Sequence, residues 1–341
     1  MKRYILIFFM VMMIGCLSAC GSEKSGTALD QGKISVVTTI FPEYDWVMNV
    51  LGSNPAGAEV TMLLDNGVDL HSYQPTADDI VKISTCDLFI YVGGESDEWV
   101  EDALKGAVNK NMTVVNLLEV LGDSVKEEEI VEGMQAEEEH DHDHDHDEDE
   151  DHDHEHEHEE DEPEYDEHVW LSLKNTAVLV QKISDAVQKI DSANAETYKK
   201  NTAAYIEKLN VLDSRYKEEV ALGVQKTLLF GDRFPFRYLV DDYGLSYYAA
   251  FVGCSAETEA SFETITFLSK KVDELGLNAV MTIEGTDHRI AETIIQNTAS
   301  KDQKVLTLDS MQSTTSKDVK NGTTYLSIME KNLDVLKEAL K

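Results

Sequence analysis

Histidine and acidic side chains are the residues of this 341-residue chain whose types and spacing best suit metal chemistry. Eight of the eleven histidines lie in one tract between residues 140 and 158, and each is flanked by Asp or Glu. They are His140, His142, His144, His146, His152, His154, His156 and His158. Imidazole suits zinc, copper and nickel, and carboxylates add negative charge. We expect the tract to provide accessory metal capture, weak at each of many sites; the alternative is a solvated acidic linker.

The tract has no apolar residue to bury, so it cannot form a core. We therefore expect a disordered acidic and His-rich loop over about 124–163. The formal net charge of the whole chain is −37. Nucleic acid binding needs a basic stripe to contact phosphates, and this acidic chain excludes such a partner. A cation is the partner that its negative electrostatic field would attract.

Three histidines lie outside the tract, and two of them occupy expected loops between strands and helices. His71 follows the second expected strand, and His168 follows the acidic insertion. Glu284 ends the strand AVMTIE, and Asp309 ends VLTLD. Ligand-binding residues of parallel βα folds gather at the carboxyl ends of strands, so we expect these four side chains to form a metal site for zinc or manganese. His288 is expected on a helix surface.

Strands and helices alternate on both sides of a long helical region, which predicts α/β architecture with parallel βαβ units. The expected strands are 34–40, 59–64, 87–92, 112–117, 227–231, 246–253, 279–285 and 305–310. Residues 175–222 have helical periodicity with a break at Asp191-Ser192. The prediction is an N-terminal lobe over 33–192, a rigid linking helix over 193–222 and a C-terminal lobe over 223–341.

The first 32 residues have the pattern of a targeting segment. Lys2 and Arg3 precede an apolar run too short to remain as a membrane anchor, and the run ends in Leu-Ser-Ala-Cys. We expect a signal peptide over 1–19, lipidation at Cys20 and a flexible tether over 20–32, so that acyl chains hold the protein on the outer face of the cytoplasmic membrane. A plain signal peptide is the alternative.

Seven segments resemble the cluster A-I solute-binding lipoproteins of zinc and manganese ABC transporters, over nearly all of the mature chain. They are GVDLHSYQPTADD, DLFIYVGGESDEWV, DEHVWLSLKN, YKKNTAAYIEKL, YLVDDYGL, TIEGTDHRIAETI and VLTLDS. The resemblance implies two lobes with the metal in the cleft between them. It implies that His71 and His168 are the first two ligands, that Asp309 is an acidic ligand, and that Glu284 lines the cleft.

The chain departs from that family at the third ligand, which is usually His or Glu. Arg233 stands there, and its side chain only donates hydrogen bonds. Asp232, Glu284, Glu257 and Cys254 remain as candidates for the missing ligand, or the site has three protein ligands plus water. We expect Arg233 to be turned away from the metal and paired with an acid, Glu284 or Asp232.

The sequence thus predicts an anchored zinc-binding component of an importer, a monomer that passes Zn²⁺ to an ABC permease and its ATPase. The chain has no HExxH, P-loop, GxGxxG or GxSxG motif, which argues against an enzyme. Three alternatives stay open: uptake of manganese or another divalent metal, a zinc enzyme with an open coordination position, and an adhesin or metal buffer without a transport role.

Overall fold

Two four-stranded parallel sheets form the frame of the computed structural model, which describes residues 33–135, 164–255 and 259–341. The first sheet has the order β2-β1-β3-β4 and the second β6-β5-β7-β8. The strands of the first are β1 (Ser35–Thr38), β2 (Glu59–Met62), β3 (Leu88–Tyr91) and β4 (Thr113–Asn116). Those of the second are β5 (Thr227–Phe234), β6 (Ser246–Val252), β7 (Ala279–Ile283) and β8 (Lys304–Leu308). The predicted α/β class with two parallel sheets is confirmed.

Helices connect the strands, as parallel pairing requires. In the first half they are α2 (Phe41–Leu51), α3 (Ala77–Thr85), α4 (Trp99–Lys105), α5 (Leu117–Leu121) and α6 (Leu173–Ile190). The second half has α8 (Arg237–Tyr243), α9 (Phe262–Leu275), α10 (Arg289–Asn297), α11 (Ser316–Lys320) and α12 (Tyr325–Ala339). All five residues of β7 are buried, because helices cover both faces of its sheet.

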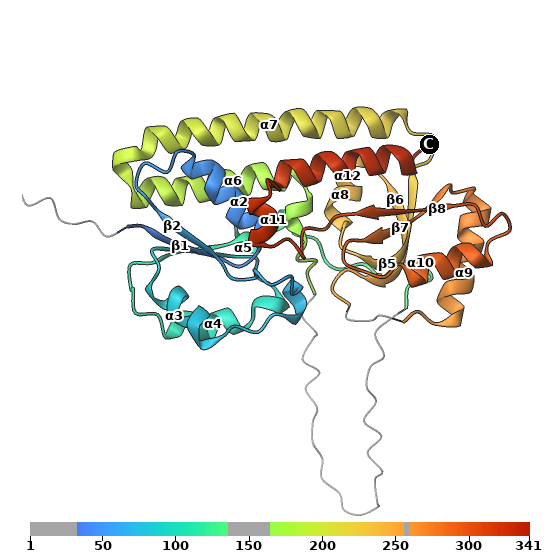
Figure 1. Ribbon diagram of the computed structural model, residues 1–341, viewed down its shortest axis with the longest axis horizontal. Coiled ribbons are helices and arrows are strands. Elements are labelled where there is room, and N and C mark those ends of the chain that lie inside the picture. Colours follow the sequence, from blue (N-terminus) through green and yellow to red (C-terminus); the bar gives the residue numbers. More distant parts are fainter. Residues whose placement is uncertain (1–32, 136–163, 256–258) are drawn as a thin grey trace, which may run out of the picture. The chain divides into compact units, whose positions relative to one another are not determined.

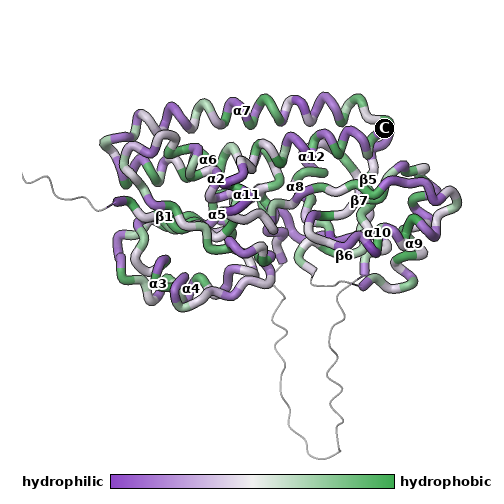
Figure 2. The backbone as a smooth tube through the Cα atoms, viewed as in Figure 1, coloured by the Kyte–Doolittle hydropathy of each residue, from purple (hydrophilic) through white to green (hydrophobic). Residues whose placement is uncertain are grey.

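The 28-residue helix α7 (Ala195–Leu222) connects the two halves and runs along both of them, with α6 and α12 beneath it (Figure 1). Its sequence alternates between hydrophobic and hydrophilic along the tube in Figure 2, and its buried positions recur at helical spacing. The predicted long linking helix is confirmed. The break before it also lies where the sequence predicted, since α6 ends at Ile190 and α7 begins at Ala195. At the break Asp191 accepts a hydrogen bond from the Tyr198 hydroxyl at 2.6 Å.

The core crosses from one half to the other, so both sheets belong to a single compact unit over Lys33–Lys341. The rings of Trp46 on α2 and Tyr325 on α12 meet edge to face with centroids 5.5 Å apart. The indole of Trp170 donates to the carbonyl of Ser310 at 2.8 Å. These buried contacts join segments that are more than a hundred residues apart in the sequence.

Two predicted boundaries are corrected by the structure. Strand β5 does not end at residue 231, as predicted, but continues to Phe234. Its pairing with β6 shifts register between Phe230 and Arg233, and such an irregularity changes the direction of a strand. The part of the chain that the structure describes also continues past residue 124, where the acidic and His-rich loop was expected to begin. The segment 125–135 bonds to the second half, since Gln135 N donates to the carbonyl of Ala250 at 2.9 Å.

Several predicted features lie outside the described residues: the signal peptide and tether with Cys20, the eight tract histidines, and Glu257. Within the part of the chain that the structure describes, no helix combines the length and apolar character needed to cross a bilayer.

Candidate metal centre

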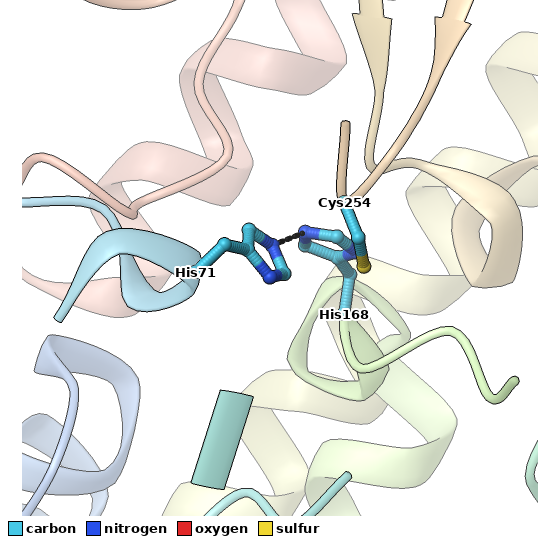
Figure 3. A group of neighbouring side chains, drawn as sticks. All are labelled: His71, His168 and Cys254. Atoms are coloured by element: carbon cyan, nitrogen blue, oxygen red, sulfur yellow. Dashed lines mark hydrogen bonds between the residues drawn. The ribbon is translucent and has the colours of Figure 1, made fainter. Parts of the chain in front are cut away.

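His71, His168 and Cys254 come together from three distant segments, each offering a ligand atom within 4.8 Å of the other two (Figure 3). His71 lies in the short 3-10 turn Leu70–Ser72 that follows β2. His168 immediately precedes the 3-10 turn Val169–Leu171, and Cys254 follows the end of β6. This is the one group of three or more potential metal ligands found among the described residues.

The His71 ring is oriented by partners on its Nδ1 side. Nδ1 lies 2.8 Å from the Ser96 hydroxyl and 3.5 Å from Glu167 Oε2. The carboxylate of Glu167 is buried, and that oxygen has no hydrogen-bond partner of its own. With the ring proton on Nδ1, His71 can donate a hydrogen bond to these oxygen partners. The lone pair of Nε2 is then free for a metal.

The His168 ring is held in the same manner by a different acid. Its Nδ1 lies 3.0 Å from Asp166 Oδ1, and the same oxygen accepts the backbone N–H of His168 at 2.8 Å. The ring is fully buried, so this contact fixes its tautomer and its direction. Nε2 is again the nitrogen left to bind a metal.

The two free nitrogens face each other, with Nε2 of His71 3.2 Å from Nε2 of His168 (Figure 3). Two converging lone pairs repel unless a proton or a cation lies between them. A tetrahedral zinc with Zn–N bonds of roughly 2.0–2.1 Å holds two nitrogens about 3.3 Å apart. The observed separation therefore matches a shared metal ion.

The surroundings keep His71 neutral. Burial, followed by the charge of His168, lowers the pKa of His71 to about 3. Burial also acts to lower the pKa of His168, but the neighbouring carboxylates of Asp166 and Glu167 outweigh it and raise that pKa. The environment therefore favours the neutral form of His71 and the protonated form of His168, and a metal ion competes with that proton.

Two acids outside the predicted ligand set have matching positions. Asp69 and Asp166 each stand two residues before a site histidine, and each accepts the backbone N–H of that histidine, at 3.1 and 2.8 Å. The repeated Asp-x-His spacing is the signal that could have identified them. In both cases the acid fixes the backbone from which the ring projects.

Arg233 forms an ion pair with an acid, as expected, but the predicted partners, Glu284 and Asp232, were wrong. Its Nη2 lies 2.7 Å from Asp69 Oδ2, and its Nη1 donates to the carbonyl of Ser255 at 3.3 Å. Asp232 instead accepts hydrogen bonds from Ile283 N and Thr286, so it organises the end of β7. Asp69 was missed because its pairing with Arg233 spans 164 residues of sequence.

Glu284 and Asp309 do not belong to the three-ligand group. The Glu284 carboxylate accepts hydrogen bonds from Ser310 N, the Ser310 hydroxyl and Gln312 N, at 2.6 to 3.1 Å. Burial, and then the charge of Glu284, raise the pKa of Asp309 to about 7. These two acids lie at the ends of β7 and β8, as the sequence indicated, and their role as ligands stays a prediction.

A cavity of about 230 Å³ gives access to the group. His71 and Cys254 line it together with four glutamates and two other polar residues: Glu95, Ser96, Glu128, Glu164, Tyr165 and Glu167. Carboxylates at the mouth of a cleft raise the local concentration of cations. The arrangement can receive a divalent ion and pass it to nitrogen ligands.

Fold and site together define the class: an α/β protein with two parallel-sheet halves and a candidate metal centre built from both. The chain belongs to the zinc-uptake complex component A (periplasmic) family, whose model matches residues 36–339.

Relatives with similar sequences include a zinc-binding protein AdcA of Streptococcus pyogenes, 31% identical over 99% of this chain and 61% of that protein. The zinc-binding lipoprotein AdcA of Streptococcus pneumoniae is 33% identical over 94% of this chain and 58% of its own length. The chain thus spans about three fifths of these relatives. The high-affinity zinc uptake system protein ZnuA of Bacillus subtilis is 30% identical over 99% of this chain and 98% of that protein.

Solved structures show the same fold. The Zn(II)-bound ZnuA-like domain of Streptococcus pneumoniae AdcA superposes with a TM-score of 0.66 at 28% identity, over 91% of this chain and 99% of that domain. The metal-dependent lipoprotein YcdH of Bacillus subtilis gives a TM-score of 0.69 at 26% identity, over 90% and 99% of the two chains.

Proposed function

We propose that this protein captures Zn²⁺ in the cleft between its two halves and delivers it to a membrane permease of the ABC type. The observation that carries the proposal is the facing pair of Nε2 atoms, 3.2 Å apart, in rings whose Nδ1 atoms are engaged elsewhere. The zinc-binding and zinc-uptake names of the relatives support the same ion.

The proposal includes the location and the partners. Lipidation at Cys20 would hold the protein outside the cytoplasmic membrane, where the eight histidines of the tract would concentrate zinc near the cleft. The permease and its ATPase would take the ion from the cleft. Binding rather than catalysis is the role we assign, because the relatives are named as zinc-binding and zinc-uptake proteins.

The test measures the tight zinc site of the full chain by competition with a high-affinity chelator, so that weak tract sites do not register. We expect His71→Ala and His168→Ala each to weaken zinc binding at least tenfold, since loss of an outer-shell partner alone costs about 10–100-fold. His288→Asn is the matched control, because His288 has φ 58° and Asn tolerates that backbone conformation. Unchanged affinity in both alanine variants would refute the proposal.

A further inference from the structure

We propose that Cys254 is the third protein ligand of the cleft metal, bound as a thiolate where relatives of this fold would use another side chain. The inference rests on the proposed function and specifies its site as a His₂Cys centre. A fourth position stays open for water or for a ligand supplied during delivery.

The geometry already brings the sulfur close. The Cys254 Sγ lies within 4.8 Å of the ligand nitrogens of both histidines, and Figure 3 shows the thiol beside the His168 ring. In a tetrahedral zinc site with Zn–S near 2.3 Å, nitrogen and sulfur are about 3.6 Å apart. A movement of roughly 1 Å therefore completes the centre, which the end of a strand can make when an ion enters.

The backbone next to Cys254 is shaped for this approach. A Cβ atom on Gly253 would lie 3.0 Å from His168 Cε1 and 3.0 Å from the carbonyl of Phe234. Glycine at this position lets the chain pass directly against the His168 ring, so that residue 254 reaches the metal side. The backbone N–H of Cys254 donates to Glu128 Oε1 at 3.3 Å, which ties the turn to the acidic cavity.

The other described candidates for the missing ligand either cannot bind a cation or are held outside the histidine group. The guanidinium of Arg233 cannot bind a cation and is held by Asp69. Asp232 supports the end of β7 through Ile283 N. The carboxylate of Glu284 accepts three hydrogen bonds from the segment 310–312. Among these side chains, Cys254 alone shares both the histidine group and the access cavity.

A thiolate ligand would also decide which ion the site selects. Soft sulfur ligands favour zinc, whereas manganese prefers carboxylate, carbonyl and water oxygens. The inference therefore predicts that Mn²⁺ competes poorly with Zn²⁺ for this cleft. It separates this protein from the manganese alternative left open by its sequence.

Cobalt substitution of the full chain provides the test. A cobalt–thiolate bond gives an intense near-ultraviolet charge-transfer band that imidazole and carboxylate ligands, including those of the tract, do not produce. We expect the band in the parent protein and in the matched control Cys86→Ala, and its loss in Cys254→Ser. Cys254→Ser should also weaken zinc binding at least tenfold. Absence of the band in the parent, or its persistence in Cys254→Ser, would overturn the inference.

A second measurement uses the unmodified protein, in case the variant does not fold. Zinc should slow alkylation of Cys254 by iodoacetamide, read by peptide mass mapping, and a chelator should restore the rate. Equal alkylation with and without zinc would overturn the inference. If the His71 and His168 variants still lose zinc in that case, the proposed function stands and only the thiolate assignment fails.

Discussion

The guanidinium of Arg233 lies 2.7 Å from the carboxylate of Asp69, in an ion pair that joins the two halves of the fold beside the histidine pair. Asp69 Oδ1 is in turn 3.9 Å from Nε2 of His71. Asp69 thus stands between a fixed positive charge and the His71 ring. Its carboxylate offsets the repulsion that a guanidinium exerts on a dication.

The charges of this pair predict opposite effects on zinc affinity. Asp69→Asn keeps an oxygen for the backbone N–H of His71 but leaves Arg233 uncompensated, so zinc affinity should fall about tenfold, which is about 1.4 kcal/mol. Arg233→Gln removes the positive charge and should leave the affinity equal or higher. Chelator competition measures both. A loss of similar size in the two variants would show that the ion pair acts only as a structural contact.

The close approach at Gly253 predicts a sharp steric effect. Gly253→Ala should displace the His168 ring or the end of β6, because its new Cβ would be 3.0 Å from both His168 Cε1 and the carbonyl oxygen of Phe234. We expect zinc affinity to fall at least tenfold. Gly106→Ala is the control, since its nearest atom would be at an ordinary 3.6 Å and its φ is negative. If both variants bind zinc as the parent does, the packing of His168 against residue 253 is not required.

The cleft and the His-rich tract should be separable. Side chains of the cleft are held in place by the fold, whereas the sequence of the tract has no apolar residue with which to form a core. Deleting residues 137–162 should leave one tight zinc site and remove several weak ones in a calorimetric titration. A full-length variant with the eight tract histidines changed to Asn should give the same result. Loss of the tight site in either protein would make the tract the principal receptor.

The stability of the fold should depend on the protonation of Asp45. Burial, opposed by a hydrogen bond from Tyr205, raises the pKa of Asp45 from 3.8 to about 6. A raised folded pKa gives stability that is complete below the unfolded pKa and is lost as pH rises through the folded value. Asp45→Asn removes this dependence and keeps an acceptor for the Tyr205 hydroxyl.

The parent's free energy of unfolding relative to Asp45→Asn should therefore fall by about 3 kcal/mol between pH 3.5 and pH 7. Urea denaturation at a series of pH values checks this. Asp102→Asn serves as the control, because the Asp102 side chain is 87% exposed. A difference between parent and Asp45→Asn that does not change with pH would contradict the assignment.

The sequence was enough to predict the parallel α/β architecture, the long helix and two of the three side chains of the candidate metal centre. Alternating strands and helices permit few topologies, and side chains at the carboxyl ends of parallel strands collect at one edge. His71 could therefore be placed in a site without knowledge of any contact. The helix α7 could also be predicted, because the spacing of its apolar residues is a local property of 28 consecutive residues.

Which groups face each other across the two halves depends on long-range packing. Cys254 joins His71 from 183 positions away, and Arg233 selects Asp69 over the nearer Asp232. Such pairings depend on how two sheets pack against α7 and on a register shift within β5, which no local pattern encodes. The sequence indicated which residue types could bind a metal. That Cys254 is the third member of the cluster with His71 and His168 became clear only from the fold.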